Sequence, residues 1–284
     1  MKVRFVVDSA SDVPQHYVDR YGMYVIPLYV NYGGNSYADN GQDLNRLEYY
    51  QLLKTIDPIP QTSAPSVGVA GEALLAASQG YDHLFIVTIS SKLSGTHNAL
   101  RLAAEQYLQP GQYTLIDSEQ LSTGSGWLAV LGAEAAEASN GNIAQIRAVM
   151  ERVKQHTEVY AAMTTVEFLR KGGRISWGQA TVGGFLKIRP IVQLQNGLIE
   201  SVARARTEKK WLDQLEAFIR QHQPIERIAF LYGLDPAPKD ELKQRVADIL
   251  PPAIEEIIVT PSIGTHTGPE AIGVALVRKG WKDA

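Results

Sequence analysis

The sequence contains no cysteine among its 284 residues. Disulfide bonds, cysteine nucleophiles and thiolate metal sites are therefore excluded, and nothing points to an oxidising compartment. An excess of one charge is also lacking, since 27 Lys and Arg residues face 30 Asp and Glu residues, for a formal net charge of -3. Such a chain has no global positive field to attract nucleic acid or anionic lipid, so we expect no nucleic-acid partner.

Long hydrophobic runs are missing as well. No stretch approaches the roughly 18 apolar residues that a membrane span needs, so we expect no transmembrane segment. The first apolar run, residues 3–7, ends at Asp8 and is too short for the core of a signal peptide. Together with the lack of cysteine, this favours a cytoplasmic protein. The composition, 45% hydrophobic and 20% charged, is that of an ordinary globular protein.

Short β-branched apolar runs alternate with segments of helical period in the first half of the chain. The expected strands are residues 3–7, 24–30, 83–89 and 113–116. A helix follows each of them, one with Asp43 as its expected N-cap and another near residues 97–107. Four repeats of strand, loop and helix predict right-handed βαβ units. The fold class is therefore α/β, with an N-terminal α/β/α domain built on a mostly parallel sheet.

The pattern changes near Asn142, which could cap a helix running to about His156. A chain of this length favours two domains, and we place them at residues 1–156 and 157–284. In the second half, Asn196-Gly197 stands between two short apolar runs, which predicts a type I′ hairpin and local antiparallel pairing. Further strands flank helices here, one of them capped by Thr207. The expected C-terminal domain is α/β with a mixed sheet.

Segments rich in hydroxyl groups or glycine follow three of the expected strands of the first half, and a further one, residues 62–66, leads into an expected helix. The four segments are residues 8–12, 62–66, 90–96 and 117–126. Ligands of parallel sheets bind at such loops, where helix N-termini favour an anion. Lys92 is their only cation, so a single carboxylate suits them better than a polyphosphate. Helix capping alone also explains the Ser, Thr and Asp residues, but it does not require Gly95, Gly124 and Gly126, which can admit a ligand close to the backbone.

Histidine spacing gives no zinc site, and we expect no metal. His266 lies in an expected loop, residues 264–269, and is the best functional histidine because an imidazole can donate a hydrogen bond near neutral pH. No Walker loop is present and no G-x-G-x-x-G follows a strand. Ser94 precedes Gly95, but Lys92 stands where a nucleophile elbow has its first glycine. A serine-dependent hydrolase or acyltransferase that uses Ser94 and His266 is therefore the alternative function.

Several segments together resemble the DegV family, fatty-acid-binding proteins that include the binding subunits of bacterial fatty acid kinases. In family order they are residues 8–12, 62–66, 90–96, 117–118, 173–176, 187–191 and 266–269. The resemblance implies an acyl chain in an apolar tunnel and its carboxylate near an interdomain cleft. Thr62 and Ser94 match family positions that hold the carboxylate, with Ser63, Gly95 and His266 nearby.

The resemblance also implies a role in phospholipid metabolism. The chain would be a lipid-binding carrier without catalytic residues or a cofactor of its own, and its ligand would be a long-chain fatty acid. A separate fatty acid kinase would convert the presented carboxylate to acyl phosphate with ATP. Arg204 and Arg206 stand one residue apart, so on an extended strand they would point the same way. We expect them to contact the kinase or the transferred phosphate.

Overall fold

The computed structural model describes residues 1–175 and 189–282. Ser176, Lys187 and Ile188, which belong to two of the segments that carry the resemblance, lie outside the described residues. The first sheet has four parallel strands in the spatial order β2-β1-β6-β7. They are β1 (Val3–Asp8), β2 (Tyr24–Ile26), β6 (His83–Thr88) and β7 (Tyr113–Asp117).

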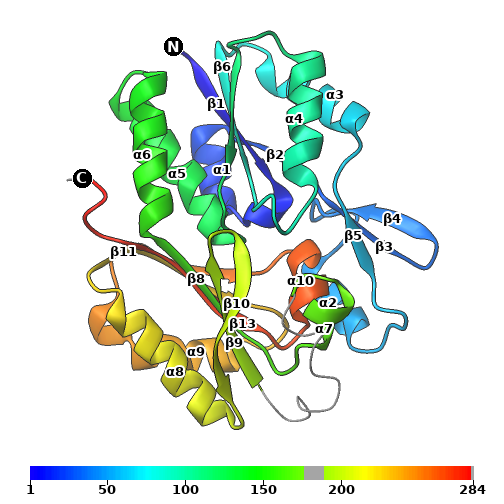
Figure 1. The fold of residues 1–284 in the computed structure, drawn as a ribbon, viewed down its shortest axis with the longest axis vertical. Helices are drawn as coiled ribbons and strands as arrows, with labels where there is room; N and C mark the ends of the chain where they lie inside the picture. Colours follow the sequence, from blue (N-terminus) through cyan, green and yellow to red (C-terminus); the bar gives the residue numbers. More distant parts are fainter. Residues whose placement is uncertain (176–188, 283–284) are drawn as a thin grey trace.

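Helices cover both faces of this sheet (Figure 1). All six residues of β6 are buried, as expected for the centre of a parallel sheet. Two pairs of helices lie on opposite sides, and a short helix, α1 (Gln15–Tyr21), follows β1. The pairs are α3 (Val67–Ser78) with α4 (Thr96–Tyr107), and α5 (Thr123–Ala138) with α6 (Ile143–His156). Asn142 caps α6 as predicted, since its side chain accepts a hydrogen bond from the N–H of Gln145.

A small antiparallel sheet, ordered β4-β3-β5, was not predicted. Its strands are β3 (Tyr29–Tyr32), β4 (Asn35–Ala38) and β5 (Gln61–Ser63). The single strand expected at residues 24–30 is therefore wrong, because the chain leaves β2 before Pro27 and enters β3 after it. The N-cap expected at Asp43 is also wrong. Helix α2 (Arg46–Leu53) is capped by Asn45, whose side chain accepts from two backbone N–H groups.

The second sheet is mixed, with the order β10-β9-β8-β13-β11-β12. Its strands are β8 (Thr157–Ala162), β9 (Arg189–Gln195), β10 (Leu198–Ala205), β11 (Ile225–Tyr232), β12 (Ile254–Ile258) and β13 (Ile272–Arg278). Asn196 and Gly197 join β9 to β10 with φ values of 50° and 77°, as the predicted type I′ turn requires. The α/β fold class, with one parallel and one mixed sheet, is thus confirmed.

Helices pack on the outer side of the second sheet and at its junction with the first. They are α7 (Glu167–Lys171), α8 (Glu208–Gln221), α9 (Ala237–Arg245), α10 (Pro261–Thr267) and two 3₁₀ turns, η1 (Ser9–Ser11) and η3 (Ala247–Ile249). Thr207 caps α8 as predicted. The division into domains at residues 156 and 157 stays a prediction.

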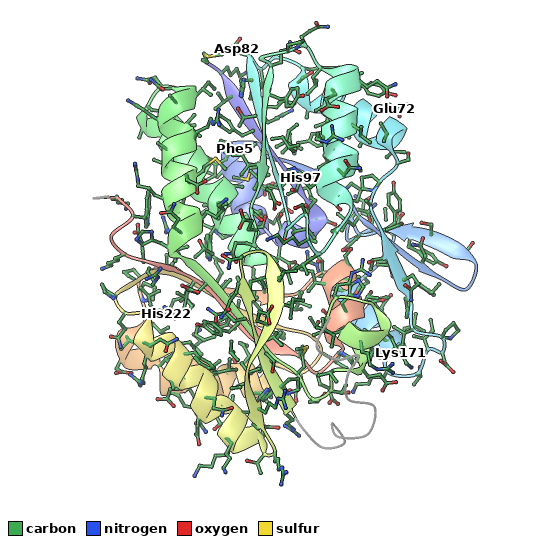
Figure 2. All side chains as sticks on the ribbon, viewed as in Figure 1. Phe5, Glu72, Asp82, His97, Lys171 and His222 are labelled. Carbon is green, nitrogen blue, oxygen red and sulfur yellow. The ribbon has the colours of Figure 1, made fainter. Side chains whose placement is uncertain are left out.

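One hydrophobic core joins the two sheets. Trp127 of α5 is fully buried, and its indole N–H donates to the carbonyl of Ala275 in the second sheet at 3.4 Å. Phe5 of the first sheet and Val159 of the second belong to the same cluster. Figure 2 shows Phe5 inside the layers and Glu72 on the outside. This packing sets the loops at the carboxyl ends of β1 and β6 against the second sheet. Among residues 1–175 and 189–282, no helix combines the length and the apolar character that crossing a bilayer requires.

Candidate functional site

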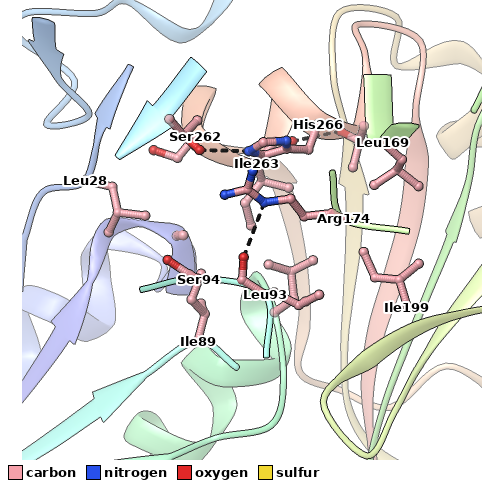
Figure 3. Close-up of a pocket in the computed structure, with 14 residues that line it drawn as sticks. Leu28, Ile89, Leu93, Ser94, Leu169, Arg174, Ile199, Ser262, Ile263 and His266 are labelled. Carbon is pink, nitrogen blue, oxygen red and sulfur yellow. Dashed lines mark hydrogen bonds between the residues drawn. The ribbon is translucent and has the colours of Figure 1, made fainter. Parts of the chain in front are cut away.

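A cavity of ≈ 50 Å³ lies between the strand ends of the first sheet and the second sheet (Figure 3). Most of its wall is apolar and comes from distant parts of the chain, including Leu28, Ile89, Leu93, Leu121, Leu169 and Ile199. Its polar groups come from Thr62, Ser94, Arg174, Ser262, His266 and Thr267. Three of the residues singled out from the sequence, Thr62, Ser94 and His266, therefore meet at one hollow. A largely apolar wall with few polar groups is typical of a small-molecule site.

His266 lies on a helix rather than in the expected loop. Helix α10 begins at Pro261, whose fixed φ suits the first turn, and ends before Gly268 with φ of 85°. The His266 Nε2 atom is 2.8 Å from Oγ1 of Thr62 on β5. Burial lowers the pKa of His266 to about 3, and the positive charge of Arg174 acts in the same direction. The imidazole is therefore neutral at pH 7 and offers one N–H.

The other ring nitrogen of His266 faces the backbone. Its Nδ1 atom is buried, and it has no hydrogen-bond partner in the part of the chain that the structure describes. A Cβ atom added at Gly172 would lie 2.1 Å from this nitrogen, so a side chain at that position would displace the ring. Glycine at 172 is thus explained by close approach rather than by an unusual backbone angle.

Ser94 lies in the loop between β6 and α4. Its Oγ atom accepts a hydrogen bond from the backbone N–H of Thr96 at 3.2 Å and is 2.8 Å from the Thr96 hydroxyl. These contacts help to cap α4, because Gly95 at the N-cap position has no side chain to do so. If the Thr96 hydroxyl also donates to Ser94, the O–H of Ser94 is left to donate into the cavity.

Two predicted site residues lie beside the cavity rather than in its wall. Ser63 follows Thr62 on β5, so its side chain points to the opposite face, where it is exposed and bonded to Asn31 at 3.1 Å. Gly95 is exposed, and a Cβ atom there would meet no atom within 4 Å. A part for Ser63 and Gly95 in ligand binding stays a prediction.

The glycines of α5 have a packing role, which corrects the suggestion that they admit a ligand. A Cβ atom at Gly124 would lie 2.4 Å from the side chain of Val159, and one at Gly126 would lie 2.6 Å from the carbonyl oxygen of Ser11. Both positions thus need glycine because α5 passes close to its neighbours. Neither glycine borders the cavity.

Arg174 brings a positive charge to the cavity. Its Nε atom donates to the carbonyl of Leu93 at 3.3 Å, and its guanidinium also donates to the carbonyl of Gly172. Burial lowers the pKa of Arg174 from its ordinary value, but an arginine remains charged at neutral pH. The signal that could have identified Arg174 was its place in one of the segments that carry the family resemblance.

Lys92 does not line the cavity. Its ammonium group donates to the carbonyl of Asn196 at 2.7 Å, and the hydroxyl of Ser90 donates to the carbonyl of Gly197 at 2.7 Å. These bonds hold the tip of the β9–β10 hairpin against the loop that carries Leu93 and Ser94. The hairpin contributes Ile199 to the cavity wall, so the contact closes one side of the cavity.

Buried carboxylates surround a second hollow of ≈ 300 Å³ next to η1. Asp8 accepts from the N–H of Ile89 at 2.9 Å, which ties β1 to β6, and Asp12 accepts from the Ser122 hydroxyl at 2.7 Å. Burial raises the pKa of Asp8 to about 7 and that of Asp12 to about 6. Among the described residues, no group of three or more His, Cys, Asp or Glu side chains could hold a metal ion. Asp8 and Asp12 thus hold neighbouring loops in place through hydrogen bonds.

The serine alternative requires a contact that the structure does not contain. A general base must lie within about 2.6–3.2 Å of the nucleophile whose proton it takes. Over residues 1–175 and 189–282, Ser94 bonds to Thr96 and His266 bonds to Thr62, and the two make no hydrogen bond to each other. The low pKa of His266 also makes it a weak base.

Arg204 and Arg206 do not line the cavity and lie at the edge of the second sheet. Arg204 is on β10, the edge strand, opposite Pro190 of β9, and Arg206 directly follows the strand. Both side chains are exposed. A contact with a partner protein stays a prediction.

Comparison with known proteins gives one consistent result. A family model described as "Uncharacterised protein, DegV family" matches residues 2–279. A DegV domain-containing protein of Deinococcus radiodurans is 29% identical over 97% of this chain and 98% of its own length. Another, from Streptomyces coelicolor, is 30% identical over 96% of this chain and 98% of its own length.

Solved structures of similar proteins share the whole architecture. A DegV family protein from Thermus thermophilus, described by its fatty acid binding, is 32% identical with a TM-score of 0.88, and the match covers 98% of this chain and 100% of that one. A protein from Thermotoga maritima, whose structure reveals a fatty acid binding function, is 26% identical with a TM-score of 0.86, over 98% of this chain and 99% of that one.

Proposed function

Since the chain belongs to the DegV family, we propose that it binds a long-chain fatty acid, with the carboxylate held by Thr62 and Ser94 and with His266 orienting the Thr62 hydroxyl. The observation that carries this proposal is the cavity itself, where these three polar residues meet an apolar wall. The two solved relatives described above, which are known for fatty acid binding, support the same ligand class.

The head group would be held by neutral donors and one nearby cation. A carboxylate only accepts hydrogen bonds, so the site must supply O–H or N–H groups. If the Nε2–H of His266 donates to Thr62, the Thr62 hydroxyl is left to donate to the ligand, as Ser94 does when it accepts from Thr96. Each bond to a charged group contributes about 1.5–3 kcal/mol. The guanidinium of Arg174 adds favourable charge without a metal ion.

The acyl chain requires the cavity to widen. A volume of ≈ 50 Å³ is well below the roughly 300 Å³ at which ordinary ligand pockets begin. Apolar side chains such as Leu93 and Ile199 must therefore move apart to open a tunnel between the two sheets. Burial of the chain favours this change, because each buried CH₂ group contributes about 0.8 kcal/mol.

We expect one fatty acid to copurify with each chain. Native mass spectrometry of gently purified protein, followed by extraction and identification of the ligand, measures this directly. The stripped protein should also bind acids of roughly 14 to 18 carbons. Protein that is empty and fails to bind any of these acids would contradict the proposal. Labelling of Ser94 by a fluorophosphonate, with turnover of an activated ester, would instead support the serine hydrolase.

A carrier role for a separate kinase extends this proposal. The bound carboxylate oxygen would attack the γ-phosphorus of ATP on the kinase, forming a new P–O bond while the bond to the β-phosphate oxygen breaks and ADP leaves. The absence of a Walker loop in the sequence supports a carrier that relies on a partner for the nucleotide. Arg204 and Arg206 are the cations that we assign to this contact.

Removal of both charges should separate binding from phosphorylation. The double variant Arg204→Ala/Arg206→Ala is expected to bind fatty acid within about twofold of the wild type, while acyl phosphate formation with kinase and ATP falls about tenfold or more. Arg101→Ala, on the exposed face of α4, is the matched control and should leave both quantities unchanged. Loss of fatty acid binding in parallel with activity would contradict the assignment, and so would wild-type activity of the double variant.

A further inference from the structure

Helix α10 carries His266 but is too short to hold itself in place. It has seven residues, and its N-cap residue Thr260 makes no side-chain capping bond. Helices shorter than about 12 residues are marginal in isolation. The orientation of α10, and with it the position of the imidazole, therefore depends on contacts with the rest of the protein.

Two buried carboxylates from the opposite end of the sequence bind the first turn of α10. Asp39, directly after β4, accepts from the backbone N–H of Ser262 at 3.0 Å and also from its hydroxyl. Asp12 accepts from the backbone N–H of Thr260 at 3.0 Å. The first N–H groups of a helix have no partner within it and favour negative charge, so these carboxylates take the place of the missing cap. Asp39 is only 4% exposed.

The residue that Asp39 binds lies one helical turn from His266. Residues four apart lie on the same face of a helix, and Ser262 and His266 both border the cavity. Thr265 on a neighbouring face is held by the hydroxyl of Tyr49 at 2.6 Å. A rotation of the first turn about this second contact would carry the imidazole away from Thr62.

We propose that Asp39 is a positioning residue of the head-group site, which holds His266 against Thr62 by binding the first turn of α10. This inference rests on the proposed fatty acid function and adds a residue that does not touch the ligand, because the carboxylate of Asp39 is engaged with Ser262 and does not border the cavity. Asp39 is suited to the task since one of its oxygens accepts from both donors of Ser262.

The coupling between Asp39 and His266 tests the proposal. Fatty acid affinity is measured by calorimetry for Asp39→Ala, with and without His266→Gln. Asp39→Ala should raise Kd about tenfold in the wild type and less than about twofold in the His266→Gln background. Full additivity of the two effects would overturn the proposal, since a residue that acts through His266 loses its effect when His266 is absent. Glu72→Ala, which removes an exposed carboxylate on α3, is the control and should leave Kd unchanged.

A second readout does not need the lipid. The ¹⁵N resonance of His266 Nε2 in stripped protein reports its bond to Thr62, and Asp39→Ala should shift it, whereas Asp39→Asn, which keeps an acceptor for the Ser262 N–H, should stay close to the wild type. An unchanged resonance in Asp39→Ala would overturn the proposal. If Asp39→Ala does not fold, Asp39→Glu, which keeps the charge but displaces the carboxylate by one methylene group, takes its place in both comparisons with the same expected results. A wild type that binds no fatty acid would instead defeat the proposed function, and the resonance would still decide the role of Asp39.

Discussion

Replacement of His266 by Gln is expected to make the protein more resistant to acid unfolding. The pKa of the buried imidazole is about 3 in the folded protein, against an ordinary value of 6.5. Between these two values the unfolded chain binds a proton that the folded protein does not, so the wild type loses stability as pH falls. The loss is about 1.4 kcal/mol per pH unit and about 4–5 kcal/mol at pH 3. Glutamine does not bind a proton in this pH range, so the variant avoids this loss of stability.

The measurement is the free energy of unfolding in urea for stripped wild type and His266→Gln at several values between pH 7 and pH 3.5. The variant should gain stability relative to the wild type with every step below about pH 6.5, because all other titrating groups are shared. His16→Gln, which changes an exposed histidine, is the control. Parallel curves for wild type and His266→Gln would show that His266 protonates freely in the folded state, and would contradict its burial.

The parallel sheet could be predicted from the sequence because its physical cause is local. A strand buried on both faces needs a continuous apolar run, and residues 84–87 within the expected strand 83–89 are such a run. The hairpin at Asn196-Gly197 was equally visible, since both residues tolerate the positive φ that the type I′ turn demands. Features that depend on a single segment of the chain could thus be predicted from the sequence.

Elements that are stabilised by residues distant in the chain could not be predicted from the sequence. The sequence around His266, with two glycines and two threonines, has a low helix propensity, and a loop was expected there. The helix forms because Asp12 and Asp39, more than 200 residues earlier, bind its first turn. The strands β3 and β4 were missed for a similar reason, since they carry several polar residues and gain their stability from each other.

The candidate site, too, could be predicted only where its features are local in the sequence. Ser94 and Thr62 were identified through family resemblance, while local patterns indicated only loops that suit an anion. Their meeting with His266 follows from contacts such as the Thr62–His266 bond, which joins residues 204 positions apart. Arg174 lies in one of the segments that carry the family resemblance, but its approach to the cavity depends on the carbonyls of Leu93 and Gly172. A pattern in the sequence does not show which residues far apart in the chain come into contact.

Ser94→Ala is expected to weaken fatty acid binding about 10- to 100-fold, because it removes one donor to a charged carboxylate. Calorimetric titration of stripped protein with a single fatty acid measures this change. The melting temperature should fall only slightly, since the variant also loses the contacts of Ser94 with Thr96, a capping interaction of about 1 kcal/mol. Ser91→Ala, an exposed serine of the same loop outside the cavity wall, controls for the loss of a hydroxyl group. Equal affinity for Ser94→Ala and Ser91→Ala would mean that Ser94 only caps α4, and the head group would then have to be held by Thr62 and Arg174.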